Sequence, residues 1–402
     1  MKTRFDFGYD VLGPIFFAFC SRLHLFLDAY SDGAALFSAR GGWRLRALYD
    51  IYLDRYGYSA PTKLSNFLIS RLSASMACLC SDFEYIVKII TQEFHNQPIS
   101  NVLSVYAPGI SVDIPPGKAK QRVYPKVFRE IYFSPACLAV REFHERQHEL
   151  LRRHINECTD GKKRIALIDT GWTGHTQAIL MRSFRGREWN GAYFGKWDYK
   201  KEKPWHFYSI NGLFVDDSLP RGKQPASTFA LFHNHHVIED PMEPPCESVS
   251  FYRDLGTGIT SNLLHDFDPL TLRAEDSHFS GILAYFRDCS LGSFSQVQKS
   301  SRKAMENLAR LVKYPRQSEV DIVKCNPRSW DYGRNGSTQC IIKNIKDISL
   351  QHKITRIKYA IWKQGQLRIE FGFLSFPFLF LFNSSKRFRS LLEGAWKKDT
   401  KQ

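Results

Sequence analysis

This chain of 402 residues has no CxxC pair, although it contains nine cysteines. The cysteines are odd in number and widely scattered, so the sequence predicts neither a disulfide framework nor a zinc knuckle, and a reducing cytoplasm suits it best. The chain also lacks a P-loop, a serine nucleophile elbow and a Rossmann glycine fingerprint. None of the short motifs that by themselves identify these enzyme classes is therefore present.

Acidic residues are the scarcer charged group, with 40 Asp plus Glu against 56 Lys plus Arg and a formal net charge of +16. Such an excess attracts nucleic acid, anionic lipid or a phosphorylated metabolite. Nucleic acid is disfavoured, because no helix-turn-helix, RNA-recognition or zinc motif accompanies the charge. A hydrophobic content of 43% excludes a disordered or collagen-like chain.

Short apolar runs next to glycine-rich turns predict an α/β fold with an open, mainly parallel sheet flanked by helices. Strands are expected over residues 34–38, 67–75, 164–171 and 191–195. Helices are expected to follow the first and third of these strands, from about residues 43 and 173. Strands that alternate with helices are typical of a parallel sheet.

Three features predict the domain organisation. The apolar stretch 11–26 is interrupted by Arg22 and His24, so it is expected to be a buried core helix rather than a signal peptide or a membrane span. Residues 80–160 are expected to form a helical insertion, in which an amphipathic helix over 141–156 turns its histidines to solvent. The α/β core is placed over 1–255, and a mostly helical C-terminal region over 256–402.

Residues 371–382 carry six phenylalanines in the run FGFLSFPFLFLF, and a basic cluster follows. The residues expected at a membrane interface are Phe376, Phe378, Phe380, Lys386, Arg387 and Arg389. An aromatic patch beside cations predicts contact with an anionic membrane surface, which would make the protein cytoplasmic and peripheral at the inner face of the cell membrane. The alternative is a hydrophobic clamp that packs on the core.

The strongest local signal is IALIDTGWTGHTQ over residues 165–177, an apolar strand that leads through a Gly- and Thr-rich turn into a helix. This turn would offer free backbone amides and a helix N-terminus to a phosphate or carboxylate. The candidate phosphate or substrate ligands here are Gly171, Thr173, Gly174, His175, Thr176 and Gln177. Asp169, at the end of the strand, is placed to bind Mg²⁺ or to act as a catalytic base. The alternative is a capping turn that packs Trp172 on the core.

Two further strand ends carry candidate ligands. Arg40, Gly41 and Gly42 follow the first strand, where the glycines let a ligand approach the backbone and the guanidinium can bind phosphate in a bidentate manner. Arg71 lies within the second expected strand. Together with Asp169, these residues predict two guanidiniums and one carboxylate at one edge of the sheet, which suits a phosphorylated sugar. A surface arginine is the alternative for Arg40.

The segment LFHNHHVIED offers His233, His235 and His236 as metal ligands, with Glu239 and Asp240 close behind. On an extended segment, adjacent His235 and His236 would point to opposite sides, so at most one pair of histidines could converge. We therefore expect no zinc in this protein, and Mg²⁺ at Asp169 is the metal that the sequence favours.

The blocks ALFSARGG, FLISRLSAS, LIDTGWTGHTQ and VIEDPMEPPCESVSFY resemble conserved blocks of predicted haloacid-dehalogenase-superfamily proteins of bacterial polysaccharide and cell-envelope gene clusters. The resemblance covers roughly residues 5–252. The matching positions are Arg40, Gly42, Arg71, Asp169, Gly171, Trp172, Gly174 and Gln177. It implies a phosphorylated sugar or nucleotide sugar as ligand, and a hydrolase or transferase reaction. Gly41 stands where the family has an acid, which favours the alternative of a non-catalytic membrane-surface partner of a glycosyltransferase.

The run IALIDTGWTGHT is also faintly similar to the phosphate loop of phosphoribosyltransferases, in which an apolar strand is followed by two acids and T-G-x-T. This chain has one acid and Thr173-Gly174-His175-Thr176. The resemblance implies a Rossmann-like or phosphoribosyltransferase-like sheet, and a phosphoribosyltransferase-like enzyme as a further alternative.

Overall fold

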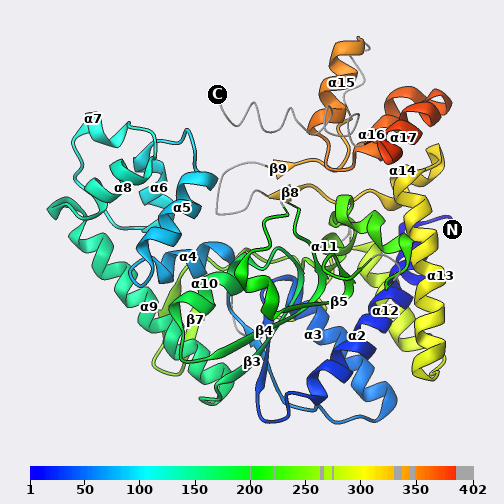
Figure 1. Ribbon diagram of the computed structural model, residues 1–402, viewed down its shortest axis with the longest axis horizontal. Helices are drawn as coiled ribbons and strands as arrows, with labels where there is room; N and C mark the ends of the chain where they lie inside the picture. The colour runs from blue at the N-terminus through cyan, green and yellow to red at the C-terminus, as the bar shows by residue number, and fades with distance from the viewer. Residues whose placement is uncertain are drawn as a thin grey trace.

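The computed structural model describes residues 1–199, 201–220, 223–262, 267–273, 276–329, 337–343 and 349–385. A sheet of five parallel strands lies at its centre, and helices cover both faces of that sheet (Figure 1). The strands are β1 (Ala34–Ser38), β2 (Lys63–Phe67), β3 (Arg164–Trp172), β4 (Glu188–Lys196) and β5 (Ile210–Asp216). The predicted α/β class and parallel sheet are thus confirmed.

The strands are arranged in the order β2-β1-β3-β4-β5. The chain leaves β1 toward one edge of the sheet to form β2, and it returns to the other side of β1 to form β3. The register pairs Leu36 of β1 with Ser65 of β2 and with Leu167 of β3. In open parallel sheets, such a reversal leaves a crevice at the carboxyl ends of the two strands, where ligands bind.

The strand expected over residues 67–75 is wrong. The strand ends at Phe67, and helix α4 (Arg71–Cys78) begins four residues later. Ser70 caps this helix, because its hydroxyl accepts a hydrogen bond from the Ser73 amide at 3.0 Å and the Ser73 hydroxyl accepts one from the Ser70 amide. Arg71 is consequently the first residue of a helix rather than part of a strand.

Alternate side chains of the sheet enter two separate hydrophobic cores. Phe37 and Ile168 belong to the core with helices α2 (Gly13–Asp28), α3 (Gly41–Tyr56), α12 (Ser277–Asp288) and α13 (Phe294–Lys313). Leu36 and Leu167 belong to the core with α4, α9 (Leu138–Thr159) and α10 (His175–Ser183). The stretch 11–26 is a buried helix, as expected, and α12 packs on it and on the preceding π-helix η1 (Gly8–Leu12). The boundary near residue 255 stays a prediction.

Helices fill the segment between β2 and β3, but the solvent-facing position expected for the histidines of α9 is wrong. His144 and His154 are buried. The His144 ring contacts the Tyr132 hydroxyl at 3.1 Å and the Tyr106 carbonyl at 2.8 Å, and the ring of His154 accepts from the Leu68 amide at 3.0 Å. Burial lowers the pKa of His144 to about 4, so this ring stays neutral at physiological pH.

The remaining elements are short and connect or extend these layers. They are α1 (Arg4–Phe7), α5 (Phe83–Glu93), α6 (Ile99–Tyr106), α7 (Pro116–Ala119), α8 (Pro125–Tyr132), η2 (Pro135–Cys137), η3 (Trp205–Ser209), η4 (Ala226–His233), α11 (His236–Met242), β6 (Tyr252–Asp254), β7 (Ile259–Ser261), α14 (Gln317–Val323), β8 (Arg328–Ser329), β9 (Ser337–Thr338), α15 (Leu350–Tyr359), α16 (Lys363–Phe371), η6 (Gly372–Leu374) and α17 (Ser375–Ser384). Helices α15, α16 and α17 lie together beyond the end of α14 (Figure 1).

Among the residues that the structure describes, two helical stretches are long and apolar enough to cross a membrane by length and composition, Arg4–Asp28 and Lys363–Ser384. The first is mostly buried in the core, as core helices of soluble proteins also are, whereas only 33% of the apolar window of the second is buried. In α17, Leu379 and Phe382 pack inward, and Phe376, Phe378 and Phe380 are 60%, 36% and 56% exposed. The expected basic residues Lys386, Arg387 and Arg389 lie outside the described residues.

Candidate functional site

A pocket of about 130 Å³ opens at the carboxyl ends of β1 and β3. Each of the three predicted segments contributes to its wall. The pocket is lined by Ser38, Ala39, Arg40, Gly41, Ile69, Ser70, Arg71, Asp169, Thr170, Gly171, Thr176, Glu239, Glu243 and Ser248. The structure therefore brings Arg40 and Arg71 together with the last residues of β3 and with Thr176 of α10, as the sequence predicted.

Backbone geometry explains why glycine is needed near the end of β3 and directly before α10. Gly171 has a φ of +101°, and a Cβ at this position would lie 2.0 Å from the Gly195 carbonyl oxygen of β4. Gly174 has a φ of +64° and immediately precedes α10, so the chain makes a left-handed turn at the start of the helix. Two residues therefore separate the carboxyl end of β3 from the first residue of α10.

Some predicted ligands lie outside this pocket. Thr173 and His175 line a second pocket of about 250 Å³, whose wall includes the aromatic rings of Trp197 and Trp205. Gln177 is buried, where its amide donates to the Ser209 carbonyl at 3.2 Å and its oxygen accepts from the Tyr193 hydroxyl at 3.0 Å. A packing role for Gln177 follows from these contacts.

Gly42 and Trp172 also have packing roles. A Cβ on Gly42 would come within 2.9 Å of the Ile168 carbonyl oxygen, so this glycine lets α3 approach β3 closely. Trp172 is 5% exposed and belongs to the core. This is the position that the alternative of a capping turn predicted for its side chain.

Asp169 has an environment that favours proton exchange. Its Oδ1 accepts a hydrogen bond from the Thr170 amide at 2.7 Å. Burial, with a smaller contribution from nearby Glu239, raises the pKa of Asp169 to about 6. The hydrogen bond from the Thr170 amide and the positive charge of Arg71 oppose this shift. A carboxyl group that titrates near neutral pH can act as a general base or bind a divalent cation.

Glu239 and Glu243 were not predicted as parts of this site, where a single carboxylate was expected. Glu239 lies on α11, and Glu243 directly follows that helix. An oxygen of Glu243 lies 3.7 Å from the Arg40 guanidinium, and Glu239 lies 3.8 Å from the His235 ring. The i, i+4 spacing of the two acids was the available signal, because residues so spaced can share one face of a helix. The pocket therefore combines two guanidiniums with three carboxylates.

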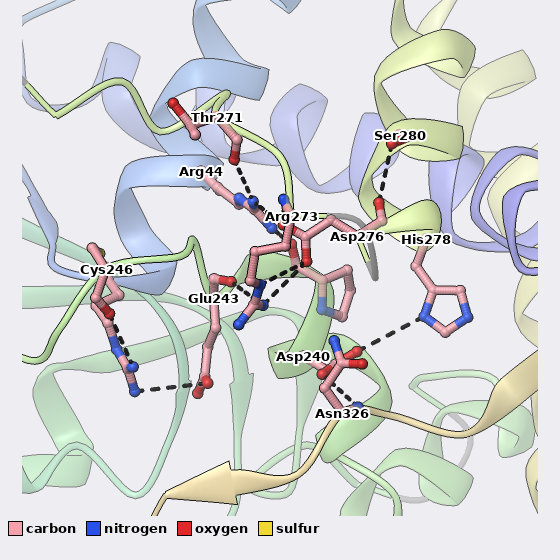
Figure 2. Close-up of polar contacts among 12 residues, drawn as sticks. Arg44, Asp240, Glu243, Cys246, Thr271, Arg273, Asp276, His278, Ser280 and Asn326 are labelled. Carbon is pink, nitrogen blue, oxygen red and sulfur yellow. Dashed lines mark hydrogen bonds and ion pairs between the residues drawn. The ribbon is translucent and has the colours of Figure 1, made fainter.

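A buried arginine holds the acid-bearing segment in place behind the pocket (Figure 2). Arg44 of α3 is fully buried, and its guanidinium lies 2.7 Å from Asp276 and 4.0 Å from the centre of the Phe279 ring. It donates to three carbonyl oxygens, those of Pro241 at 2.8 Å, Thr271 at 2.9 Å and Pro269 at 3.1 Å. Because Pro241 lies within α11, this fork links α3 directly to the helix that carries Glu239.

The same network reaches Glu243 through a second arginine. Arg273 contacts Asp276 at 3.1 Å and donates to the carbonyl of Glu243 at 3.1 Å (Figure 2). Burial alone would raise the pKa of Asp276, but hydrogen bonds from the Arg273 amide and from Arg44 outweigh it and lower that pKa. Asp276 is therefore ionised at neutral pH, and it fixes two arginines that position the acids of the pocket.

Comparisons of this chain with protein-family models and with curated proteins find no match. The resemblance to haloacid-dehalogenase-superfamily proteins thus stays a prediction, and the chemistry of the pocket has to be inferred from its residues. Guanidiniums and helix amides bind phosphate oxygens, and carboxylates bind divalent cations or accept protons.

Proposed function

We propose that the pocket at the carboxyl ends of β1 and β3 binds the phosphate of a phosphorylated sugar or nucleotide sugar. The observation that carries this proposal is the meeting of Arg40 and Arg71 with Thr176, in the first turn of α10. Guanidiniums form charge-assisted hydrogen bonds to phosphate oxygens, and the N-terminus of a helix also favours an anion. At about 130 Å³, the pocket is smaller than most ligand sites. It suits a phosphoryl group whose sugar extends outward.

We further propose that the three acids hold Mg²⁺ next to that phosphate. Carboxylate and phosphate oxygens are the usual protein and substrate ligands of Mg²⁺. Asp169, Glu239 and Glu243 supply the carboxylates. With its pKa raised to about 6, Asp169 is also suited to accept a proton from a sugar hydroxyl. Phosphoryl or glycosyl transfer, or hydrolysis, would follow from this arrangement.

We also propose a type for the central sheet and a biological role for the protein. The strand order β2-β1-β3-β4-β5, with a phosphate loop after β3, supports a Rossmann-like or phosphoribosyltransferase-like sheet. The resemblance of the sequence blocks to haloacid-dehalogenase-superfamily proteins supports a role in bacterial polysaccharide or cell-envelope biosynthesis.

A second candidate function is that of a membrane-surface partner of a glycosyltransferase. The observation that favours it is the row of exposed aromatic rings on the last described helices, where Phe373 is 84%, Phe376 60% and Phe380 56% exposed. Exposed apolar patches of this kind mark membrane or protein contacts. Together with the net charge of +16, this surface suits an anionic leaflet.

A thermal-shift series tests the first proposal. Sugar phosphates, nucleotide sugars and phosphoribosyl pyrophosphate, each with and without Mg²⁺, are added to the full-length protein, because only a ligand of the native state raises the midpoint. We expect a shift that Mg²⁺ enlarges. Removing one charged hydrogen-bond donor costs about 1.5–3 kcal/mol, so Arg71→Ala should weaken binding roughly ten- to hundredfold.

The matched control is Arg152→Ala, since Arg152 is exposed on α9 and pairs with Glu149 outside the pocket. This variant should bind as the wild type does. Equal binding by Arg71→Ala and wild type, or no shift with any of these ligands, would contradict the proposal.

A further inference from the structure

Three side chains with metal-binding chemistry meet outside the pocket. They are His236 at the start of α11, Cys325 just after α14 and Cys340 just after β9. Their ligand atoms all lie within 4.8 Å of one another, and the three residues are 1%, 5% and 2% exposed. Cys325 lies 89 residues after His236 in the sequence, and Cys340 lies 15 residues after Cys325. The fold thus places two thiols and one imidazole at one buried point.

We propose that His236, Cys325 and Cys340 bind a zinc ion. Zinc in proteins is bound at tetrahedral sites by three or four side chains, most often of cysteine and histidine, and thiolate ligands favour zinc over magnesium or calcium. The ligand set here is Cys₂His, with the fourth position left to a water molecule. This inference does not depend on the function proposed for the pocket.

The histidine supplies the first independent support. Neither ring nitrogen of His236 has a hydrogen-bond partner among the described residues, although both nitrogens are buried. Buried polar groups in native proteins nearly always have a partner, and each exception needs an explanation. A metal ion at this point gives one ring nitrogen the partner that it lacks.

The thiols supply the second support. Both thiols are buried, and Cys340 Sγ accepts a hydrogen bond from the Cys325 amide at 3.2 Å. The Cys325 thiol lies 3.5 Å from the His236 carbonyl oxygen. The two sulfur atoms and the imidazole are therefore close enough together for one metal ion to contact all three.

The neighbouring histidine that the sequence also offered lies elsewhere. His235 packs near Trp172, with ring centres 5.8 Å apart, and its Nε2 lies 3.8 Å from Glu239. Of His233, His235 and His236, only His236 belongs to the cluster with the cysteines. The expectation that no zinc binds rested on the three histidines alone, and it did not consider cysteines so distant in the sequence.

A metal at this site would anchor the acid-bearing helix of the pocket. His236 begins α11, and Glu239 follows on the same helix. At the far end of the cluster, the Cys340 carbonyl accepts from the Trp362 amide at 3.2 Å, which connects the site to the start of α16. Beside it, the Asn326 amide donates to Asp240 of α11 at 2.9 Å (Figure 2). Zinc would therefore tie α11 to the two segments that carry the cysteines.

The test measures zinc in the full-length protein, purified without chelators and then dialysed with a small excess of Zn²⁺. Elemental analysis should give one zinc per chain. His236→Ala, Cys325→Ser and Cys340→Ser should each lose it, whereas His235→Ala and Cys80→Ser should keep it. Cys80 is the matched cysteine control, because its thiol is exposed and lies outside the cluster.

Two measurements on the wild type keep the proposal testable if the variants do not fold. Cys325 and Cys340 should resist alkylation until a strong zinc chelator is added, as peptide mass spectrometry would show. Cobalt added to the chelator-treated protein should give a thiolate-to-cobalt charge-transfer band. Absence of zinc from the reconstituted wild type, zinc retained by Cys325→Ser, or a Cys325–Cys340 disulfide in the zinc-treated protein would each overturn the proposal.

Discussion

Replacing Arg44 by Leu tests the scaffold behind the pocket. The change leaves the Asp276 carboxylate, which is 2% exposed, without its closest cation, and it leaves the carbonyls of Pro241, Thr271 and Pro269 without this donor. Removing one partner of a buried ion pair costs about 3–5 kcal/mol, because the remaining charge stays in the protein interior. Arg273 still contacts Asp276 at 3.1 Å, so we expect a loss near the lower end, about 3 kcal/mol.

Arg46→Leu is the matched control, two residues along the same helix. Arg46 pairs with Asp50 at 2.9 Å, but both side chains are partly exposed, at 24% and 45%. Exposed ion pairs contribute about 0–1 kcal/mol, so this variant should lose less than about 1 kcal/mol. The stability lost by Arg44→Lys should lie between the losses of these two variants, since an ammonium keeps the charge but cannot make the same set of hydrogen bonds as the guanidinium.

The assay is urea unfolding at pH 7, monitored by tryptophan fluorescence. The dependence of the unfolding free energy on urea concentration is compared between variants, because midpoints report stability only where this slope is unchanged. A double variant in which Leu also replaces Asp276 should recover part of the stability lost by Arg44→Leu, because the buried carboxylate is then removed together with its closest cation. If Arg44→Leu and Arg46→Leu lose the same stability within about 0.5 kcal/mol, the buried network does not hold the fold as argued.

Two further predictions concern Asp169 and the aromatic tail. Burial raises the pKa of Asp169 in the folded protein to about 6, above the ordinary value of about 3.9 for an aspartate, so ionisation of this carboxyl opposes folding. Relative to Asp169→Asn, the wild type should lose about 3 kcal/mol of unfolding free energy as the pH rises from 3 to 8. Parallel pH profiles of the two proteins would refute this. Full-length protein should float with anionic vesicles at low salt. The double variant Phe376→Ser/Phe380→Ser should float less but keep the thermal unfolding midpoint of the wild type, because both rings are exposed. Phe382→Ser should lower that midpoint, because this ring is buried. Equally poor flotation with anionic and neutral vesicles would contradict membrane binding by these exposed rings.

The sequence predicted the strands whose residues are apolar on both faces. β1, β3 and β4 each contain a short apolar run close to a glycine, and such runs are typical of the buried strands of a parallel sheet. β2 lies at the edge of the sheet, and its residues KLSNF are mixed in polarity, so the apolar residues after it were mistaken for the strand. Helix α4 starts there because Ser70 and Ser73 form a capping box. In the sequence, the apolar run indicated a strand more strongly than these two serines indicated a helix start.

The convergence of three strand ends could be predicted because parallel strands all end at the same edge of a sheet. The contribution of Glu239 could not, since it depends on how α11 packs, and Arg44 fixes that packing through contacts with residues almost 200 positions away. The burial of His154 likewise depends on the distant Leu68 amide. The cluster of His236, Cys325 and Cys340 has no sequence motif, because its ligands come from three separate segments.

The most direct test of the phosphate site is a crystal structure of the full-length protein with ribose 5-phosphate and Mg²⁺. The account predicts a phosphate within hydrogen-bonding distance of the Arg71 guanidinium and of the Thr176 amide, with the metal between that phosphate and Asp169. A ligand bound in the second pocket or elsewhere on the surface, with the pocket between β1 and β3 empty, would contradict it.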